Sequence, residues 1–298
     1  MPKAKTNGLE LEYESFGDPR DPTVLLIMGL GAQLLSYPEG FCQEIAARGF
    51  RAIRYDNRDV GLSTWFDAAG IPDLSALLAR QPAPIAYTLA DMAADAVGLL
   101  DFLGVKVAHV VGTSMGGMIA QQVAISYPER VLSLTSIMSH IGGVDATPPT
   151  PEAAATLYNR PPADRDAYIE YSVEVNRVNW GPSFDEARAR ERAPIIFDRA
   201  FHPAGTARQF AAILAAPSRR EGLRRLSMPT LVIHGVEDPL VPVENGRLTA
   251  ELVPASELLL MPGVGHDLPP DWFSRLADAI AANARRGHTQ VGVGVAER

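Results

Sequence analysis

Short apolar runs alternate along this chain with longer segments in which apolar residues recur every three or four positions. The short runs have the length of β-strands, and we expect strands at 23–27, 50–55, 108–111, 131–138, 230–233 and 257–261. The amphipathic segments predict helices at 41–48, 88–103, 118–124 and 272–285, the last followed by a frayed tail at 287–298. Strands that alternate with helices are typical of a mostly parallel sheet with helices on both faces, so the sequence predicts an α/β fold.

The segment 88–103 carries the clearest helix signals. Thr88 is a favourable N-cap residue, and Asp91 three positions later completes a capping box. Gly104 follows the last apolar position, where glycine commonly ends a helix. We therefore expect a helix that begins at Thr88 and ends at Gly104.

The composition changes between residues 141 and 217. This segment holds a cluster of prolines at 148–162, many of the aromatic residues and no convincing strand. We interpret it as a helical cap, or lid, inserted between the two parts of the α/β core, 1–140 and 218–298. The alternative, that the segment is a helical part of the ordinary core, stays open at this point.

The stretch from Val110 to Met118 predicts a buried strand, a tight turn and a helix in succession. The turn carries the spacing Gly-x-Ser-x-Gly, with Ser114 between Gly112 and Gly116. Such a turn lifts the serine hydroxyl above the sheet edge, and side chains at the two glycines would collide with the neighbouring strand and helix. The N-terminus of the helix that follows favours a developing oxyanion. We therefore predict that Ser114 is a nucleophile.

A serine hydroxyl needs a base, and the base needs an acid that orients it. His266 lies in a glycine-rich loop just after a predicted strand, and Asp238 lies in a loop after the preceding strand. Both loops leave the carboxyl ends of strands, where parallel sheets place their sites. We therefore predict His266 as the base and Asp238 as the acid, with Glu237 and Asp145 as rival acids.

The bulk composition excludes several classes of protein. The net charge is −8 at pH 7, which argues against a nucleic-acid partner because such a partner requires a basic surface. Cys42 is the single cysteine, so no internal disulfide is possible and a reducing cytoplasm is expected. The first eleven residues lack the apolar region of a signal peptide, and no apolar run has the length of a membrane span.

Several stretches of the chain are typical of one family: Phe16-Gly17-Asp18-Pro19, Leu26-Ile27-Met28-Gly29, Ile53-Arg54-Tyr55-Asp56-Asn57-Arg58-Asp59, Gly61-Leu62-Ser63-Thr64, His109-Val110-Val111-Gly112, Ser114-Met115-Gly116, Pro229-Thr230-Leu231-Val232-Ile233 and Gly265-His266. Together they resemble the α/β-hydrolase superfamily, and within it the bacterial esterases of the aclacinomycin methylesterase type. The resemblance implies the same triad of Ser114, His266 and Asp238. It also implies that the backbone N–H groups of Leu30 and Met115 form the oxyanion hole. The chain departs from many relatives at Met28, where they carry histidine, and at Asp59, where they carry glycine.

The expected function is hydrolysis of carboxylic esters through an acyl-enzyme, with no metal or cofactor. Aromatic residues of the cap favour a small to medium apolar substrate, and we expect His140, Trp180 and Phe210 to line its pocket. Other chemistry on the same triad remains an alternative: perhydrolysis, lactone opening or carbon–carbon bond hydrolysis. A receptor that only binds its ligand is a further alternative. The expected partner is a small-molecule ester, and the expected assembly is a monomer or a homodimer.

Overall fold

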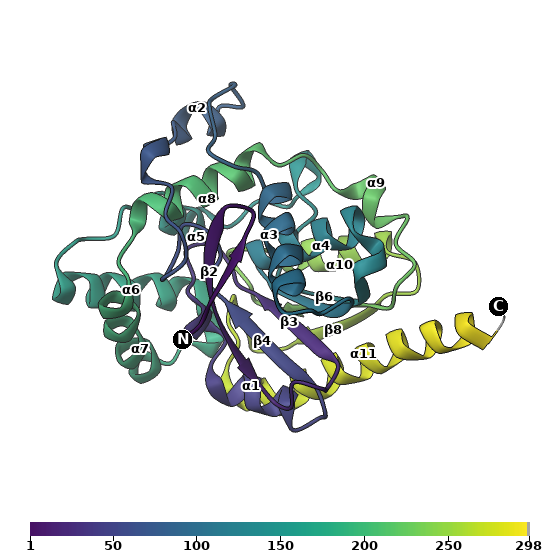
Figure 1. Ribbon diagram of the computed structural model, residues 1–298. Helices are drawn as coiled ribbons and strands as arrows, with labels where there is room; N and C mark the ends of the chain where they lie inside the picture. Colours follow the sequence, from purple (N-terminus) through teal and green to yellow (C-terminus); the bar gives the residue numbers. More distant parts are fainter. Residues whose placement is uncertain (297–298) are drawn as a thin grey trace.

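The computed structural model describes residues 1–296, with side chains for residues 1–288. These residues form an eight-stranded sheet in the order β1-β2-β4-β3-β5-β6-β7-β8 (Figure 1). Its strands are β1 (Lys3–Thr6), β2 (Leu9–Phe16), β3 (Thr23–Ile27), β4 (Arg51–Tyr55), β5 (Ala108–Thr113), β6 (Val131–Ile137), β7 (Thr230–Gly235) and β8 (Glu257–Met261). The pairs from β4 to β8 are parallel, and β2 pairs antiparallel with both β1 and β4. The predicted α/β fold is confirmed.

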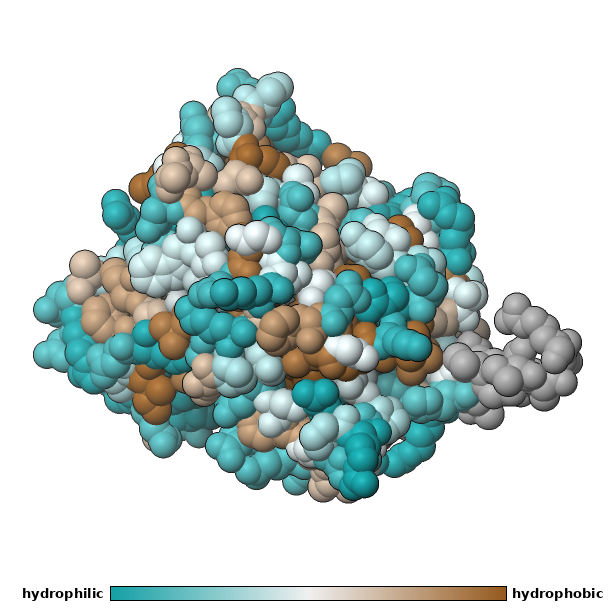
Figure 2. Space-filling model, in the orientation of Figure 1, coloured by the Kyte–Doolittle hydropathy of each residue, from teal (hydrophilic) through white to brown (hydrophobic). Residues whose placement is uncertain are grey.

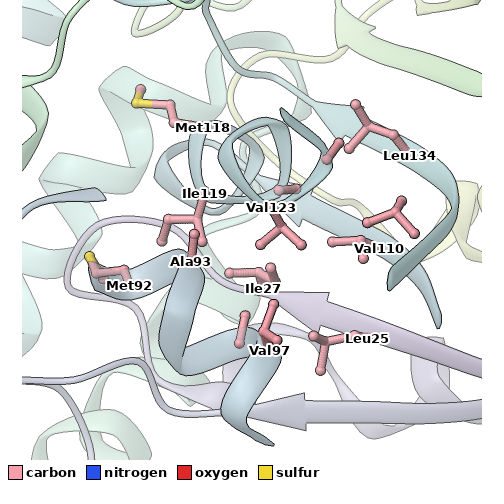
Figure 3. Packing of buried hydrophobic residues seen from close by; sticks show 14 of the residues in the cluster. Leu25, Ile27, Met92, Ala93, Val97, Val110, Met118, Ile119, Val123 and Leu134 are labelled. Atoms are coloured by element: carbon pink, nitrogen blue, oxygen red, sulfur yellow. The ribbon is translucent and has the colours of Figure 1, made fainter. Parts of the chain in front are cut away.

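Helices cover both faces of the sheet, which explains why its central strands are buried throughout. Every residue of β3, β5 and β7 is buried, as expected for parallel strands between two helical layers. On one face, Leu25, Ile27 and Val110 of the sheet pack against α3 (Leu89–Phe102) and α4 (Met115–Ser126) (Figure 3). On the other face lie α1 (Glu39–Ala46) and α11 (Phe273–Ala296) (Figure 1).

The helix at 89–102 begins and ends as the sequence predicts. Thr88 accepts a hydrogen bond from the N–H of Asp91, and the Asp91 carboxylate accepts one from the N–H of Thr88. Gly104 follows with φ 69°, a left-handed conformation that suits glycine. The capping box is therefore confirmed.

Several elements differ from the expectation. The strands β1 and β2 form a hairpin that we did not predict, although Asn7-Gly8 at its turn, with φ of 49° and 76°, is a strong hairpin signal. The short helix α2 (Leu74–Leu78) and the helix α10 (Val243–Leu252) were also missed. The last helix runs on to Ala296, so the frayed tail predicted from 287 is wrong up to that residue, and 297–298 lie outside the described residues.

Between β6 and β7 the chain forms helices and no strand, all within the described residues. The longer helices are α5 (Pro151–Tyr158), α6 (Arg165–Trp180), α7 (Glu186–Arg199) and α8 (Pro203–Ala215), and they gather on one side of the sheet (Figure 1). We call residues 141–217 the cap segment. It touches the loops that follow β3, β4, β7 and β8. The contacts are Thr206 with Gly31, Gly205 with Asp59, Thr150 with Pro239 and Trp180 with Gly265. The cap segment therefore packs on the carboxyl edge of the sheet.

Hydrophobic and hydrophilic residues are interspersed over the face of the molecule drawn in Figure 2. The large exposed apolar side chains include Trp65 and Ile71, which lie in the segment between β4 and α3 that also contains α2. Within the described residues, no helix combines the length and the apolar character that crossing a membrane requires.

Candidate active site

Ser114 has the backbone geometry of a strained turn between strand and helix. Its φ is 57° and its ψ is −122°, values that a non-glycine residue adopts only under constraint. Every other residue from 108 to 120 is buried, whereas Ser114 is partly exposed. The turn therefore lifts the side chain of Ser114 towards solvent while its neighbours stay in the core.

The two glycines of the turn are required by close packing. A Cβ added to Gly112 would lie 2.0 Å from the carbonyl oxygen of Gly116, and one added to Gly116 would lie 2.0 Å from that of Ile27. Both distances are shorter than any non-bonded contact, and the colliding atoms are backbone atoms that cannot move aside. The collision with helix and strand that the sequence predicts is thus found in the structure.

Hydrogen bonds fix the turn from two sides. The N–H of Ser114 donates to the carbonyl of Ile137 at the end of β6, at 2.9 Å. The hydroxyls of Tyr37 and Thr113 lie 2.7 Å apart, and both side chains are buried. The strain at Ser114 is therefore held by neighbours in the surrounding structure, as a strained backbone conformation requires.

Asp238 and His266 lie in direct contact. Nδ1 of His266 is 2.7 Å from Oδ2 of Asp238, and the Asp238 side chain is fully buried. The other carboxylate oxygen, Oδ1, accepts hydrogen bonds from the N–H groups of Leu240 and Val241 at 2.9 and 2.8 Å. Because these two donors hold Oδ1, Oδ2 is directed at the imidazole. The imidazole therefore presents its Nε2 away from Asp238.

The end of β7 and the loop that carries His266 approach each other closely through their backbones. A Cβ on Gly235 would lie 2.3 Å from the carbonyl oxygen of Gly265, so β7 and the histidine loop need glycine at this point. The histidine loop is also tied to the cap segment. The N–H of His266 donates to the carbonyl of Asn179 at 2.7 Å, and that of Gly265 donates to the carbonyl of Trp180 at 3.1 Å.

The strand register places the three loops at the same edge of the sheet. Thr113 pairs with Ile137 and Ile137 pairs with Ile233, so β5, β6 and β7 end at similar heights. Ser114 follows β5, Asp238 follows β7, and His266 follows β8, whose last residue Met261 pairs with Gly235 at the end of β7. This is the edge at which parallel α/β sheets carry their sites.

The rival acids lie elsewhere. Asp145 pairs with Arg220 and accepts a hydrogen bond from Ser218. Glu237 accepts the N–H of Gly263 at 2.8 Å. Asp267, next to the histidine, is buried against Arg188 of α7, and its pKa is raised because burial outweighs the effect of that arginine. Of these four carboxylates, Asp238 is the one that contacts His266.

Two further histidines lie near the site and are held in the neutral form. Burial lowers the pKa of His234, whose Nε2 lies 2.7 Å from the carbonyl oxygen of Val241. Burial also lowers the pKa of His140 to about 4, and nearby Arg219 adds to the shift. His140 accepts the N–H of Gly142 on Nδ1, so its proton is on Nε2. Its assignment to the substrate pocket stays a prediction.

The loop after β3 lies against Ser114. A Cβ on Gly29 would lie 3.1 Å from Cβ of Ser114 and 3.6 Å from its Oγ. Leu30 follows in the same loop and is half-buried, while Met115 is fully buried at the first turn of α4. Of the two residues that we expect to donate to the oxyanion, Met115 directly follows Ser114 in sequence, and Leu30 directly follows the glycine that lies against Ser114.

The predicted pocket residues of the cap segment have partners within the cap. The Trp180 ring packs beside Phe184 and under the guanidinium of Arg188, which lies 4.0 Å from the ring centre. Phe210 lies 6.1 Å from Tyr158 between ring centres. Tyr168, Phe197 and Phe201 form a further aromatic cluster inside the cap. Trp180 and Phe210, which we expect to line the substrate pocket, therefore also help to hold the cap helices together.

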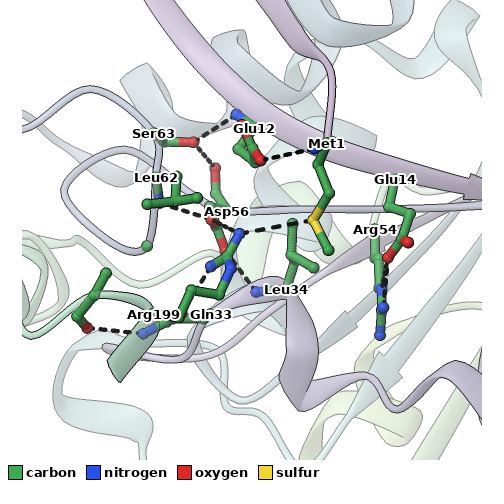
Figure 4. A network of polar contacts seen from close by, with 12 residues as sticks. Met1, Glu12, Glu14, Gln33, Leu34, Arg54, Asp56, Leu62, Ser63 and Arg199 are labelled. Carbon is green, nitrogen blue, oxygen red and sulfur yellow. Dashed lines mark hydrogen bonds and ion pairs between the residues drawn. The ribbon is translucent and has the colours of Figure 1, made fainter. Parts of the chain in front are cut away.

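Sequence reasoning missed a set of buried and half-buried polar residues around the loop after β3. They include Gln33, Asp56 and Arg199, which form the network in Figure 4, and Gln209 of α8. Asp56 lies in a stretch that carries the family resemblance, but no local pattern marks Gln33, Arg199 or Gln209, because their partners lie far away along the chain. A search for metal sites among the described residues finds no group of three or more His, Cys, Asp or Glu side chains suited to hold an ion.

Comparison with known proteins agrees with this architecture. The sequence pattern of the alpha/beta hydrolase fold family matches residues 22–271, so the chain belongs to that family. The resemblance to methylesterases is also confirmed: the chain is 31% identical to rhodomycin D methylesterase DauP of Streptomyces sp. (strain C5), over 91% of this chain and 94% of that protein.

Other relatives carry out different hydrolytic reactions. The chain is 26% identical to 3-oxoadipate enol-lactonase 2 of Acinetobacter baylyi, over 91% of this chain and 92% of that one. Among solved structures, a thermophilic esterase from Thermogutta terrifontis superposes with a TM-score of 0.74 at 25% identity, covering 96% of this chain and 98% of the other. All three proteins support a hydrolase. The methylesterase and the Thermogutta terrifontis esterase also support an esterase.

Proposed function

We propose that this protein is a serine hydrolase that cleaves carboxylic esters through an acyl-enzyme. The observation that carries the proposal is the strained, partly exposed Ser114 on the same sheet edge as the contacting pair Asp238 and His266. A hydroxyl on a strained turn and a buried acid–imidazole pair together supply the parts of a nucleophilic hydrolase.

In the proposed mechanism, Oγ of Ser114 attacks the ester carbonyl carbon while Nε2 of His266 takes the hydroxyl proton. Asp238 keeps the Nδ1–H of the ring bonded and stabilises the imidazolium that forms. The negative charge on the former carbonyl oxygen is stabilised by the N–H groups of Leu30 and Met115.

The imidazolium then gives its proton to the leaving alcohol, and the C–O bond to the alcohol breaks. A water molecule, deprotonated by His266, attacks the acyl group on Ser114 in the second half of the cycle. The carboxylic acid leaves and the serine hydroxyl is restored. Both halves use the same three side chains and the same two backbone donors.

For the substrate, we propose a neutral or apolar ester of small to medium size. The aromatic content of the cap segment supports this proposal, with His140, Trp180 and Phe210 as candidate pocket residues. The similarity to rhodomycin D methylesterase makes methyl esters the first class to test. The similarity to an enol-lactonase makes lactone opening the second candidate function, because a lactone is an internal ester that the same triad can open.

The decisive experiment is active-site labelling combined with a substrate panel. A fluorophosphonate probe is expected to label Ser114, and Ser114→Ala is expected to lose about four or more orders of magnitude in turnover. The panel consists of p-nitrophenyl esters of increasing acyl length, methyl esters of apolar acids, and simple lactones. Labelling of another residue, or full activity of Ser114→Ala, would refute the hydrolase proposal.

We also propose that the protein acts in the cytoplasm as a monomer or homodimer on a small-molecule ester. The single thiol, Cys42, is buried, which is compatible with a reducing compartment. Size-exclusion chromatography with light scattering measures the assembly directly.

A further inference from the structure

The residues around Leu30 form a tight turn with one defined shape. The N–H of Ala32 donates to the carbonyl of Gly29 at 3.3 Å and closes a four-residue turn. Gly31, the third residue, has a φ of 63°, which identifies a type II turn. In the commoner type I turn the peptide between Leu30 and Gly31 is rotated by about 150°, so that its N–H points the other way.

Gln209 of the cap segment binds the N–H that distinguishes the two turns. The N–H of Gly31 donates to Oε1 of Gln209 at 2.8 Å, and Nε2 of Gln209 donates to the carbonyl of Arg58 at 2.8 Å. The Gln209 side chain is fully buried. Rotation of its amide would set its NH₂ group against the N–H of Gly31, so both ends of the amide select one orientation. Gln209 therefore favours the type II turn.

The same turn is packed and bonded to the cap at neighbouring positions. A Cβ on Gly31 would lie 2.8 Å from Oγ1 of Thr206, so only glycine fits there without movement. Nε2 of Gln33 donates to two carbonyls at the end of α7, each at 2.8 Å, and its Oε1 accepts from Arg199 at 2.7 Å. Arg199 also pairs with buried Asp56 at 2.7 Å, as Figure 4 shows.

We propose that Gln209 is a positioning residue through which the cap holds the oxyanion turn in its active form. Because the peptide is planar and trans, the N–H of Leu30 points away from the Gly29 carbonyl that Ala32 binds. Gln209 holds the following peptide, Leu30–Gly31, by the N–H of Gly31, and so anchors Leu30 in the loop that lies against Ser114. This inference rests on the proposed function, since it takes Leu30 as an oxyanion donor.

A defect in the turn will act mainly on the transition state. The oxyanion forms only as the serine attacks, so loss of its donor slows the chemical step and leaves binding of the intact ester nearly unchanged. Purely structural damage would instead reduce the fraction of folded enzyme, and the kcat per folded site and the KM would stay unchanged. The two effects can be separated by active-site titration.

The test compares Gln209→Met with the parent enzyme on a p-nitrophenyl ester that the parent hydrolyses. We expect kcat per titrated site to fall about 10- to 100-fold with KM changed less than about threefold, somewhat less than removal of a donor itself costs. The Ki of a trifluoromethyl ketone, which adds to the serine and forms an oxyanion, should rise by a similar factor. Gly31→Ala disturbs the same turn where it packs against Thr206. It should likewise lower kcat while KM changes little.

Arg190→Gln serves as the matched control. Arg190 lies on the cap helix α7, and its acceptors Glu170 and Glu186 also belong to the cap, so its loss leaves the turn untouched. We expect parent-like kcat and Ki for this variant. A folded Gln209→Met or Gly31→Ala enzyme with parent-like Ki for the ketone overturns the inference. Full turnover by Ser114→Ala, or failure of the ketone to inhibit the parent, refutes the proposed function instead.

Discussion

Backbone hydrogen bonds orient the carboxylate of Asp238 towards His266. Two N–H groups bind Oδ1, and Oδ2 contacts Nδ1 of His266 at 2.7 Å. An amide at this position has the same shape but presents either a donor or a neutral oxygen to the ring. It therefore removes the charge that stabilises the imidazolium and allows the wrong tautomer of His266.

We expect Asp238→Asn to retain the fold and to lower kcat by about four orders of magnitude, as loss of the orienting acid does in other serine hydrolases. Steady-state kinetics at pH 7 and thermal denaturation measure the two effects. Asp145→Asn is the control, because Asp145 pairs with Arg220 at a distance from His266. If Asp145→Asn proves the more damaging change, Asp238 is not the acid.

The residues that local patterns predicted are those whose role depends on neighbours in sequence. Ser114 follows from a five-residue spacing, and Asp238 and His266 follow from their places after predicted strands. Gln209 could not be predicted, because its partner Gly31 lies 178 positions away. A buried glutamine on an amphipathic helix carries no local sign of what it binds.

At the scale of elements, the cap segment is joined to the core by a buried ion pair. Asp59 and Arg208 form two hydrogen bonds of 2.7 and 2.8 Å, and both side chains are buried. Burial opposes ionisation of Asp59, but hydrogen bonds from Arg208 and from the N–H of Phe66 outweigh it and lower its pKa. Asp59 has a φ of 69°, so the pair persists at a position that favours glycine.

Replacement of Asp59 by glycine, the residue that suits its positive φ, provides a test. Asp59→Gly relieves strain of about 1 kcal/mol but leaves Arg208 buried without its main partner, at a cost of about 3–5 kcal/mol. We therefore expect a net loss of unfolding free energy, measured by urea denaturation. The double variant Asp59→Gly with Arg208→Met should be more stable than Asp59→Gly alone. A stability of Asp59→Gly equal to the parent's would show that loss of the pair costs no more than the relief of strain, about 1 kcal/mol.

The elements that sequence patterns predicted are those with a strong hydrophobic period or with helix-capping residues. The helix at 89–102 has both, and its capping box is present. The hairpin of β1 and β2 was missed because β2 alternates leucine and glutamate without a long apolar run, and its Asn-Gly turn was not weighed. The position of the cap over the sheet edge depends on contacts between distant loops, which no local pattern encodes.

At the scale of the whole molecule, the structure holds several histidines in neutral form. His109 is buried between Ser133 and His288, with ring nitrogens 2.9 Å from the Ser133 hydroxyl and 3.0 Å from the His288 ring. Burial lowers its pKa to about 3, and the neighbouring His288 adds to the shift. Burial likewise lowers the pKa of His140 and of His234.

These shifts predict the direction in which stability depends on pH. A histidine whose folded pKa is lowered takes up its proton more readily in the unfolded chain, so its contribution is complete above pH 6.5 and is lost as the pH falls. Each such histidine adds a slope of up to about 1.4 kcal/mol per pH unit between pH 6.5 and its folded pKa. The unfolding free energy should therefore fall between pH 6.5 and 5, before carboxylates titrate.

His109→Gln separates this effect from others, because glutamine retains polar atoms for both neighbours but does not titrate. We expect urea denaturation at pH 7, 6 and 5 to give a shallower decline for His109→Gln, smaller by about 2 kcal/mol between pH 7 and 5. Ser133→Ala is the control: it removes a neutral hydrogen bond, so it should lower stability equally at each pH and leave the slope unchanged. The same slope in His109→Gln and the parent would show that His109 is protonated as easily in the fold as in the unfolded chain, which its buried position opposes.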